Sequence, residues 1–164
     1  MKAVVVYESL WGNTAAIARA IAEGIGDGAQ ALSTAEATPE ALAGVELLVG
    51  GSPLFAFQLP TDAVRENIRK KADSFPTKPD LSAPSMRDWL ESLPPGQGRC
   101  AAFETRIWWS PGSSARAIRK RLEKAGYTAM ARPKGFRVTG MTGPLKKGEL
   151  ERARKWGTRL AGNS

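Results

Sequence analysis

The sequence predicts an α/β fold: a doubly wound, five-stranded parallel sheet with helices on both faces. The first observation is that short apolar runs such as Val4–Val6 and Leu47–Val49 are typical of strands buried on both faces. The second is that segments with apolar residues at helical spacing follow these runs. Because the two patterns alternate over nearly the whole chain, we expect right-handed crossovers around one sheet.

The first unit is a strand, a loop and a helix within residues 2–25. Val4–Val6 predicts the strand and Ser9–Thr14 the loop. The following helix is expected to bury one face, made of Ile17, Ala18, Ile21 and Ile25. Gly26 and Gly28 end it, and the short segment 29–33 is a candidate edge strand.

The next segment leads to the third strand. Thr38 as N-cap and Pro39 at the first helical position predict a short helix to about Ala43. The third strand is expected over 45–50, and the Gly- and Pro-containing stretch 51–60 is expected to be a loop.

A helix capped by Thr61 is expected to follow this loop. It should turn Val64, Ile68 and Ala72 toward the sheet, and turn cations toward water, namely Arg65, Arg69, Lys70 and Lys71.

A Pro-rich insertion around residues 74–98 is expected within a single domain spanning residues 1–164. It contains a short helix after Ser85, with apolar residues at helical spacing: Met86, Trp89, Leu90 and Leu93. We expect this helix to pack beside the sheet, a partner-binding groove being the alternative.

The last third of the chain predicts two strands and two helices. The fourth strand is expected over 99–106, and the fifth over 127–131 and 136–138, interrupted by Pro133-Lys134-Gly135. One helix, capped by Ser113 or Ser114 and closed by Gly126, should bury Ala115, Ile118, Leu122 and Ala125. The final helix should bury Leu150, Ala153, Gly157 and Leu160.

Composition excludes several classes of site. There is no histidine and Cys100 is the only cysteine, so an intrachain disulfide, a Cys/His zinc site and a Ser-His-Asp triad are excluded. We expect no metal site and no catalytic side chain, and redox chemistry would need a bound cofactor. Cys100 is expected to pack as a small apolar residue, a redox role being the alternative. No apolar run is long enough to span a membrane and the first residues lack a signal-peptide pattern, so we expect a cytoplasmic protein.

The loop after the first strand has the composition of a phosphate-binding loop. It lacks the glycines of the dinucleotide fingerprint and the lysine of the nucleoside-triphosphate loop. The pattern Ser9-x-x-Gly12-Asn13-Thr14 resembles the FMN-phosphate loop of the flavodoxin family, in which hydroxyls and amides hold the phosphate. An ordinary helix cap is the alternative interpretation.

Two later loops extend the resemblance over the whole chain, and the resemblance implies the strand order 2-1-3-4-5. Gly51-Ser52-Pro53, followed by apolar residues, is similar to the family's first isoalloxazine loop, and one of Phe55 and Phe57 is expected to enter the core. The segment with Trp108 and Trp109 is similar to the second, where one tryptophan is expected to pack inward and the other to face flavin, Trp109 being preferred. The resemblance implies an FMN site made of Ser9, Leu10, Trp11, Gly12, Asn13, Thr14, Ser52, Pro53, Leu54, Phe55, Thr105, Arg106, Trp108, Trp109 and Gly112.

The sequence departs from simple flavodoxins in several places. Trp11 replaces their usual hydroxyl residue, the first ring loop lacks their common tryptophan, and the segment between the third and fourth strands is long. In having an aromatic residue at position 11, the sequence resembles the flavodoxin domains of multidomain flavoproteins.

Charge is the largest departure, since flavodoxins are typically acidic. This chain has 24 Lys and Arg against 16 Asp and Glu, a formal net charge of +8. We therefore expect an acidic redox partner, a reductase or an acceptor, at a basic face made by the last helix together with Arg116, Arg119, Lys120 and Lys124. A solvated basic surface without a partner is the alternative, and no motif predicts specific nucleic-acid binding.

Three functions remain open from the sequence. The first is a monomeric FMN electron carrier between a reductase and an acceptor, with a deazaflavin as an alternative to FMN. The second is an enzyme, an FMN-dependent NAD(P)H:quinone-type oxidoreductase. The third is a flavin-free interaction module.

Overall fold

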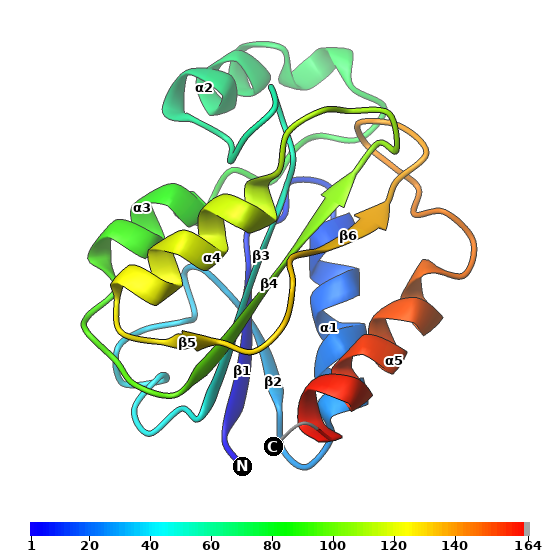
Figure 1. The fold of residues 1–164 in the computed structure, drawn as a ribbon. Coiled ribbons are helices and arrows are strands. Elements are labelled where there is room, and N and C mark those ends of the chain that lie inside the picture. Colours follow the sequence, from blue (N-terminus) through cyan, green and yellow to red (C-terminus); the bar gives the residue numbers. More distant parts are fainter. Residues whose placement is uncertain (163–164) are drawn as a thin grey trace.

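Strand β1 (Ala3–Tyr7) lies inside the sheet, and its valine side chains are fully buried. Strand β2 (Gln30–Ser33) pairs with it in parallel on one side, and β3 (Leu47–Pro53) on the other. Strand β4 (Arg99–Arg106) pairs in parallel with β3. The computed structural model describes residues 1–162 and has the strand order β2-β1-β3-β4-β5, so the predicted order is confirmed (Figure 1).

The fifth strand position is filled by two short strands, β5 (Thr128–Ala129) and β6 (Lys134–Arg137). Both pair in parallel with β4, so the sheet has 6 strands in all. Cys100 lies opposite Ala129, whereas Phe103 lies opposite Lys134. The chain between β5 and β6 therefore contains more residues than the part of β4 it faces and must bulge. The predicted interruption was misplaced, because Lys134 and Gly135 belong to β6.

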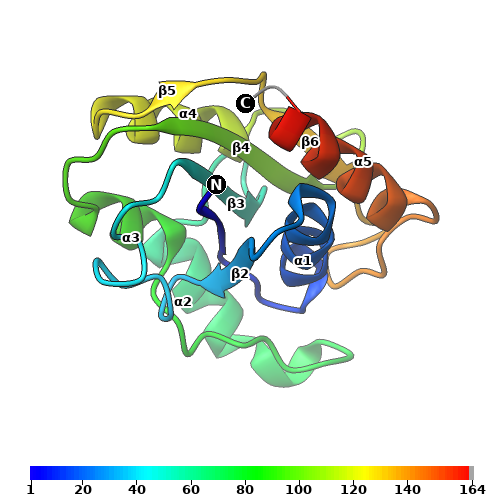
Figure 2. The same cartoon turned by 90° about the horizontal axis from the view of Figure 1, so that it is seen from below.

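Helices α1 (Asn13–Ile25) and α5 (Glu149–Gly162) lie side by side on one face of the sheet (Figure 2). Glycine allows this close contact: a Cβ on Gly157 would lie 2.2 Å from the Ile21 carbonyl oxygen. The predicted buried face of α1 is confirmed.

The predicted buried face of α5 is only partly right. Leu150 is exposed, and Trp156 is buried with Ala153, Gly157 and Leu160. Glu149 takes the inward place in the first turn, where it accepts hydrogen bonds from the Arg137 amide and the Arg152 guanidinium.

Helices α3 (Met86–Ser92) and α4 (Ser114–Lys124) cover the other face of the sheet (Figure 2). Met86, Trp89 and Leu90 pack in the same core cluster as residues of β1, β3 and α4, which confirms the expected position of the inserted helix. Ser113 is the N-cap of α4, since its hydroxyl accepts a hydrogen bond from the Arg116 amide.

Helix α2 (Asp62–Lys70) lies beyond the carboxyl ends of the strands rather than on a face of the sheet (Figure 1). Thr61 caps it as expected, and Ile68 is buried. The prediction that Arg65 faces water was wrong, because Arg65 is buried against a carboxylate described below. The short 3-10 helix Ala72–Ser74 follows.

Two local predictions around β3 were also wrong. Residues 39–44 form turns instead of a helix, although the Thr38 hydroxyl caps them by accepting from the Ala41 amide. Strand β3 continues beyond Gly50 to Pro53, because residues 51–53 pair with residues 103–105 of β4. Ser52 and Pro53 thus lie in a strand, not in a loop.

Candidate functional site

A cavity lies where the carboxyl ends of β1, β3 and β4 meet, at the point where the strand order reverses. We call it the strand-end cavity. Ten of the fifteen predicted site residues line it: Ser9, Leu10, Trp11, Asn13, Thr14, Pro53, Leu54, Phe55, Thr105 and Arg106. The loops after three strands therefore converge on one place.

Five predicted site residues do not line the cavity. Gly12 adopts a φ of 88° beside it, and Ser52 is buried in β3 with its hydroxyl donating to the Pro53 carbonyl. Trp108 and Trp109 are 70% and 65% exposed, so the expectation that one of them packs inward was wrong. Gly112 instead brings two loops together, since a Cβ there would lie 2.1 Å from the Phe57 carbonyl oxygen.

One end of the cavity is rich in hydrogen-bond donors. The backbone amides of Leu10, Trp11, Asn13 and Thr14 have no acceptor within residues 1–162. They lie at the N-terminus of α1, where the helix dipole adds partial positive charge. Hydroxyls stand beside them: Ser9 Oγ accepts from the Gly12 amide at 3.1 Å, and the hydroxyl oxygens of Thr14 and Thr105 are 2.8 Å apart. Because none of the described residues that line the cavity carries a carboxylate, this donor set fits a phosphate.

The other end of the cavity is apolar. Its walls include Leu54 and Phe55 from the loop after β3 and Ile107 from the loop after β4. The amides of Leu54 and Phe55 are already used, by the Thr105 and Gln58 carbonyls respectively. Apolar walls of this kind suit an aromatic ring system better than a second charged group.

The turn after Phe55 supplies further donors. Ala56 and Phe57 adopt positive φ angles of 47° and 70°. Positive φ is uncommon for residues with a Cβ and is costly for a bulky one. Within the part of the chain that the structure describes, the amides of Ala56 and Phe57 have no acceptor, so this turn has donors that a ligand could use.

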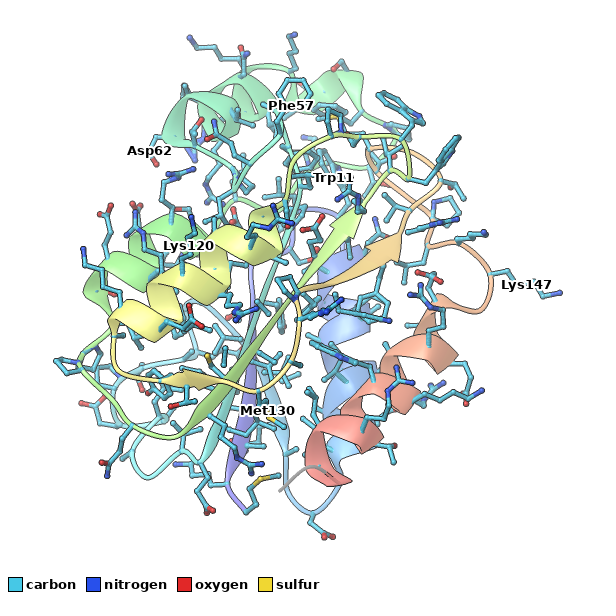
Figure 3. The ribbon with its side chains drawn as sticks, in the orientation of Figure 1. Trp11, Phe57, Asp62, Lys120, Met130 and Lys147 are labelled. Carbon is cyan, nitrogen blue, oxygen red and sulfur yellow. The ribbon has the colours of Figure 1, made fainter. Side chains whose placement is uncertain are left out.

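Trp11 links the loop Ser9–Thr14, the candidate phosphate-binding loop, to the Pro-rich insertion. Its indole Nε1 donates to the Thr77 carbonyl at 2.9 Å, and its ring contacts Phe75 edge-on at a centroid distance of 5.0 Å. The Asp80 amide also donates to the Leu10 carbonyl at 2.8 Å. Figure 3 shows Trp11 between the strand ends and the segment beyond them. Trp11 is therefore an anchor for the loop, a role that the sequence did not indicate.

A buried ion pair lies next to the loop Ser9–Thr14. Glu8 is 2% exposed, and its Oε2 lies 2.5 Å from Nη1 of Arg65 in α2. Burial raises the pKa of Glu8 above its ordinary value, although the Met86 amide and the Arg65 guanidinium lower it in part. Arg65 also donates to the Ala83 carbonyl, so the pair links the loop, α2 and the insertion.

Arg106 is held at the other side of the cavity. Its guanidinium lies 2.8 Å from a carboxylate oxygen of Glu104 and also donates to the Ser110 and Gly112 carbonyls. Glu104 is buried and accepts from the Ser113 hydroxyl and the Ala115 amide. The position of this cation is thus fixed by the start of α4.

The hairpin formed by residues 138–145 makes a fourth wall. Val138 and Met141 line the cavity, and Asn13 Nδ2 donates to the Thr142 carbonyl at 3.1 Å. No sequence pattern indicated five of the residues that line the cavity: Val138, Met141, Ala56, Ile107 and Ser110. The topology of the fold brings such residues to the cavity. The hydrogen bond between Asn13 and Thr142, for example, joins residues 129 positions apart, and such a contact leaves no local sequence pattern.

Cys100 is buried in β4, and burial raises the pKa of its thiol to about 11, so it packs as an inert apolar residue as predicted. Within residues 1–162, no cluster of acidic or Cys side chains could hold a metal ion. No helix in that range has the length and apolar character needed to cross a membrane.

Solved structures match this chain, although no protein-family model matches it and no curated protein is found to be similar. The chain is similar to flavodoxin 2 from Bacillus cereus, with a TM-score of 0.70 and 14% identity over 100% of both chains. It is also similar to a flavodoxin from the domain Archaea, with a TM-score of 0.66 and 24% identity over 99% of this chain and 97% of the other.

A larger protein contains a similar region. The rubredoxin:oxygen oxidoreductase from Desulfovibrio gigas matches with a TM-score of 0.59 and 17% identity, over 98% of this chain and 35% of the other. At these identities the matches show the fold, which is flavodoxin-like. The resemblance that the loop motifs implied is therefore confirmed for the fold.

Proposed function

We propose that this protein binds FMN in the strand-end cavity and acts as a monomeric electron carrier between a reductase and an acceptor, of which one is acidic. The observation that carries the proposal is the donor set at the N-terminus of α1: its amides have no acceptor within residues 1–162, hydroxyls lie beside them, and none of the described residues lining the cavity is a carboxylate. That set matches a phosphate monoester, and the apolar walls beside it match a flavin ring.

FMN, when bound, supplies one- and two-electron transfer at its ring. The residues of this chain bind and orient it. The amides of residues 10, 11, 13 and 14 would hold the phosphate, together with the Ser9 and Thr14 hydroxyls. Leu54, Phe55 and Ile107 would exclude water from the ring, and Arg106 would place a positive charge beside it.

A titration with FMN and riboflavin tests the proposal. Because the phosphate is the group that the free amides fit, we expect FMN to bind at least about 100-fold more tightly than riboflavin, about 2.7 kcal/mol. Isothermal calorimetry gives both affinities. Equal affinities would show that the loop holds no phosphate, and no binding of either would leave a flavin-free interaction module.

Stepwise reduction of the loaded protein separates carrier from enzyme. A carrier is expected to show a one-electron-reduced visible spectrum between the oxidised and fully reduced forms. Rapid oxidation of NADPH by the protein alone, without that spectrum, would instead indicate an oxidoreductase of the quinone-reductase type.

The basic charge predicts the redox potential of the bound flavin. Full reduction adds negative charge, which the field of a chain with formal charge +8 stabilises. We expect Arg106→Gln to lower the potential of the second electron, by about 60 mV for each tenfold loss of stabilisation. Spectroelectrochemical titration of both proteins measures the shift. An increase, or no change with FMN affinity unaltered, would contradict the assigned position of Arg106.

A further inference from the structure

Two basic grooves flank the strand-end cavity, and Arg106 lines both grooves and the cavity. The first basic groove lies between α4 and the chain that enters β6, and its other cations are Arg116, Arg119, Lys120, Arg132 and Lys134. The second basic groove lies between β6 and the start of α5, and its other cations are Arg137, Lys146 and Arg152.

The carboxylates in these grooves are already paired. Glu104 bonds Arg106, Glu123 lies 3.2 Å from Arg119, and Glu149 lies 2.7 Å from Arg152. The charge left toward solvent is therefore positive. The crowding of cations is also visible at Lys134, whose pKa is lowered by burial and by the nearby Arg152 and Arg159.

The net charge of the chain is concentrated on this face. The two grooves contain nine Lys or Arg side chains and three Glu side chains, a formal charge of +6 out of the chain's +8. A basic surface that only keeps the protein solvated would spread its charge. Of the residues expected on the basic face, Lys124 lines neither groove, and α5 contributes only Arg152 to them.

Exposed aromatic side chains accompany the grooves. Trp108 lines the second groove, and Trp108 and Trp109 are 70% and 65% exposed. Phe57 is 65% exposed and belongs to the loop that touches Gly112. Aromatic residues surrounded by charged residues are typical of protein interfaces, where tryptophan and arginine contribute most of the binding energy.

We infer that this face is the docking surface of an acidic redox protein, whose carboxylates enter the two grooves while its redox centre lies over the strand-end cavity. The inference rests on the proposed function. In each encounter one electron passes between the partner's centre and the flavin, so that one is oxidised by one electron and the other is reduced by one. The shared position of Arg106 brings the docked carboxylates and the transfer site together.

Matched charge reversals test the surface. Lys120→Glu with Lys146→Glu changes one exposed lysine in each groove, and Lys124→Glu with Lys155→Glu changes two exposed lysines outside them. Figure 3 shows Lys120 on the outer side of α4. Both doubles lower the formal charge from +8 to +4. FMN affinity is measured first for each protein, which separates failure of the proposed function from failure of this inference.

Stopped-flow transfer to the FMN-loaded protein from a reduced plant-type [2Fe–2S] ferredoxin, an acidic protein, is then compared at low salt. We expect the groove double to slow the second-order rate at least about tenfold, and the control double to change it less than about twofold. The difference should vanish at high salt. Oxidation of the reduced protein by cytochrome c, a basic protein, should become faster in the groove double.

Four results would overturn the inference. Equal slowing in both doubles would show that total charge acts and not the grooves, and an unchanged rate in the groove double would show that the grooves do not dock the partner. If the grooves changed only the affinity for a 20-nucleotide RNA, the surface would belong to a nucleic-acid site. If no protein retained FMN, the inference would fall together with the proposed function.

Discussion

Glu8→Gln is expected to destabilise the protein by about 3–5 kcal/mol, since it leaves the buried Arg65 without its carboxylate. Arginine stays protonated at any accessible pH, so its charge cannot be removed to reduce the cost. Urea unfolding at neutral pH measures the change. The substitution keeps the size of the side chain, so a cavity does not contribute.

Arg65→Met is expected to cost less and to depend on pH. The Glu8 carboxyl can take up a proton, and loss of Arg65 raises its pKa further above the unfolded value. The folded state then binds more protons than the unfolded state, so the stability of Arg65→Met should rise as pH falls from 7 toward 5.

The double variant Glu8→Leu with Arg65→Met is the control for the buried pair. It removes both charges, and we expect it to be close to the wild type because neither charge is left unpaired. A Glu8→Gln loss below about 1 kcal/mol, the range of exposed pairs, would show that the pair is solvated.

Trp11→Ala is expected to weaken FMN binding about 100-fold, or about 2.7 kcal/mol. It removes a wall of the cavity, the hydrogen bond to Thr77 and the ring contacts with Phe55 and Phe75. The loop would then have to be ordered when FMN binds, which costs affinity. Calorimetry with FMN measures this effect.

Trp11→Phe is the matched variant, because it keeps an aromatic ring and loses only the indole donor. We expect an intermediate loss of FMN affinity. Limited proteolysis without FMN gives an independent readout: the segment 76–84 should be cut faster in Trp11→Ala. Weaker FMN binding with unchanged cleavage would mean that Trp11 acts only by touching the cofactor.

The sequence was most informative where one local pattern determines the structure. The buried strands β1 and β4 and the inward face of α1 follow from continuous or helical apolar spacing. Predictions were wrong where a distant group changed the environment. Arg65 is buried only because Glu8, 57 positions earlier, pairs with it, and the strand character of Ser52 and Pro53 comes from pairing with β4.

The residues that line the cavity could likewise be predicted only where a local sequence pattern indicates their chemistry. The loop around Gly12 combines hydroxyls, glycine and a helix start within six residues, a combination with a direct chemical meaning. Val138 and Met141 carry no such signal, because ordinary apolar residues line a cavity only when topology brings them there. The loop with Trp108 and Trp109 contributes Ile107 and Ser110 to the cavity wall, but an aromatic pair in a sequence does not specify which way its rings turn.

The anchoring of Trp11 by the Pro-rich insertion also has a consequence for how the chain folds. The Trp11–Thr77 bond spans 66 positions, and closing so long a loop costs entropy that only later packing returns. A nascent or partly folded chain can therefore build β1 and α1 while the loop between them is still unconstrained. If the strand-end cavity binds FMN as proposed, we expect that ability to be acquired late, after the insertion has docked against Trp11.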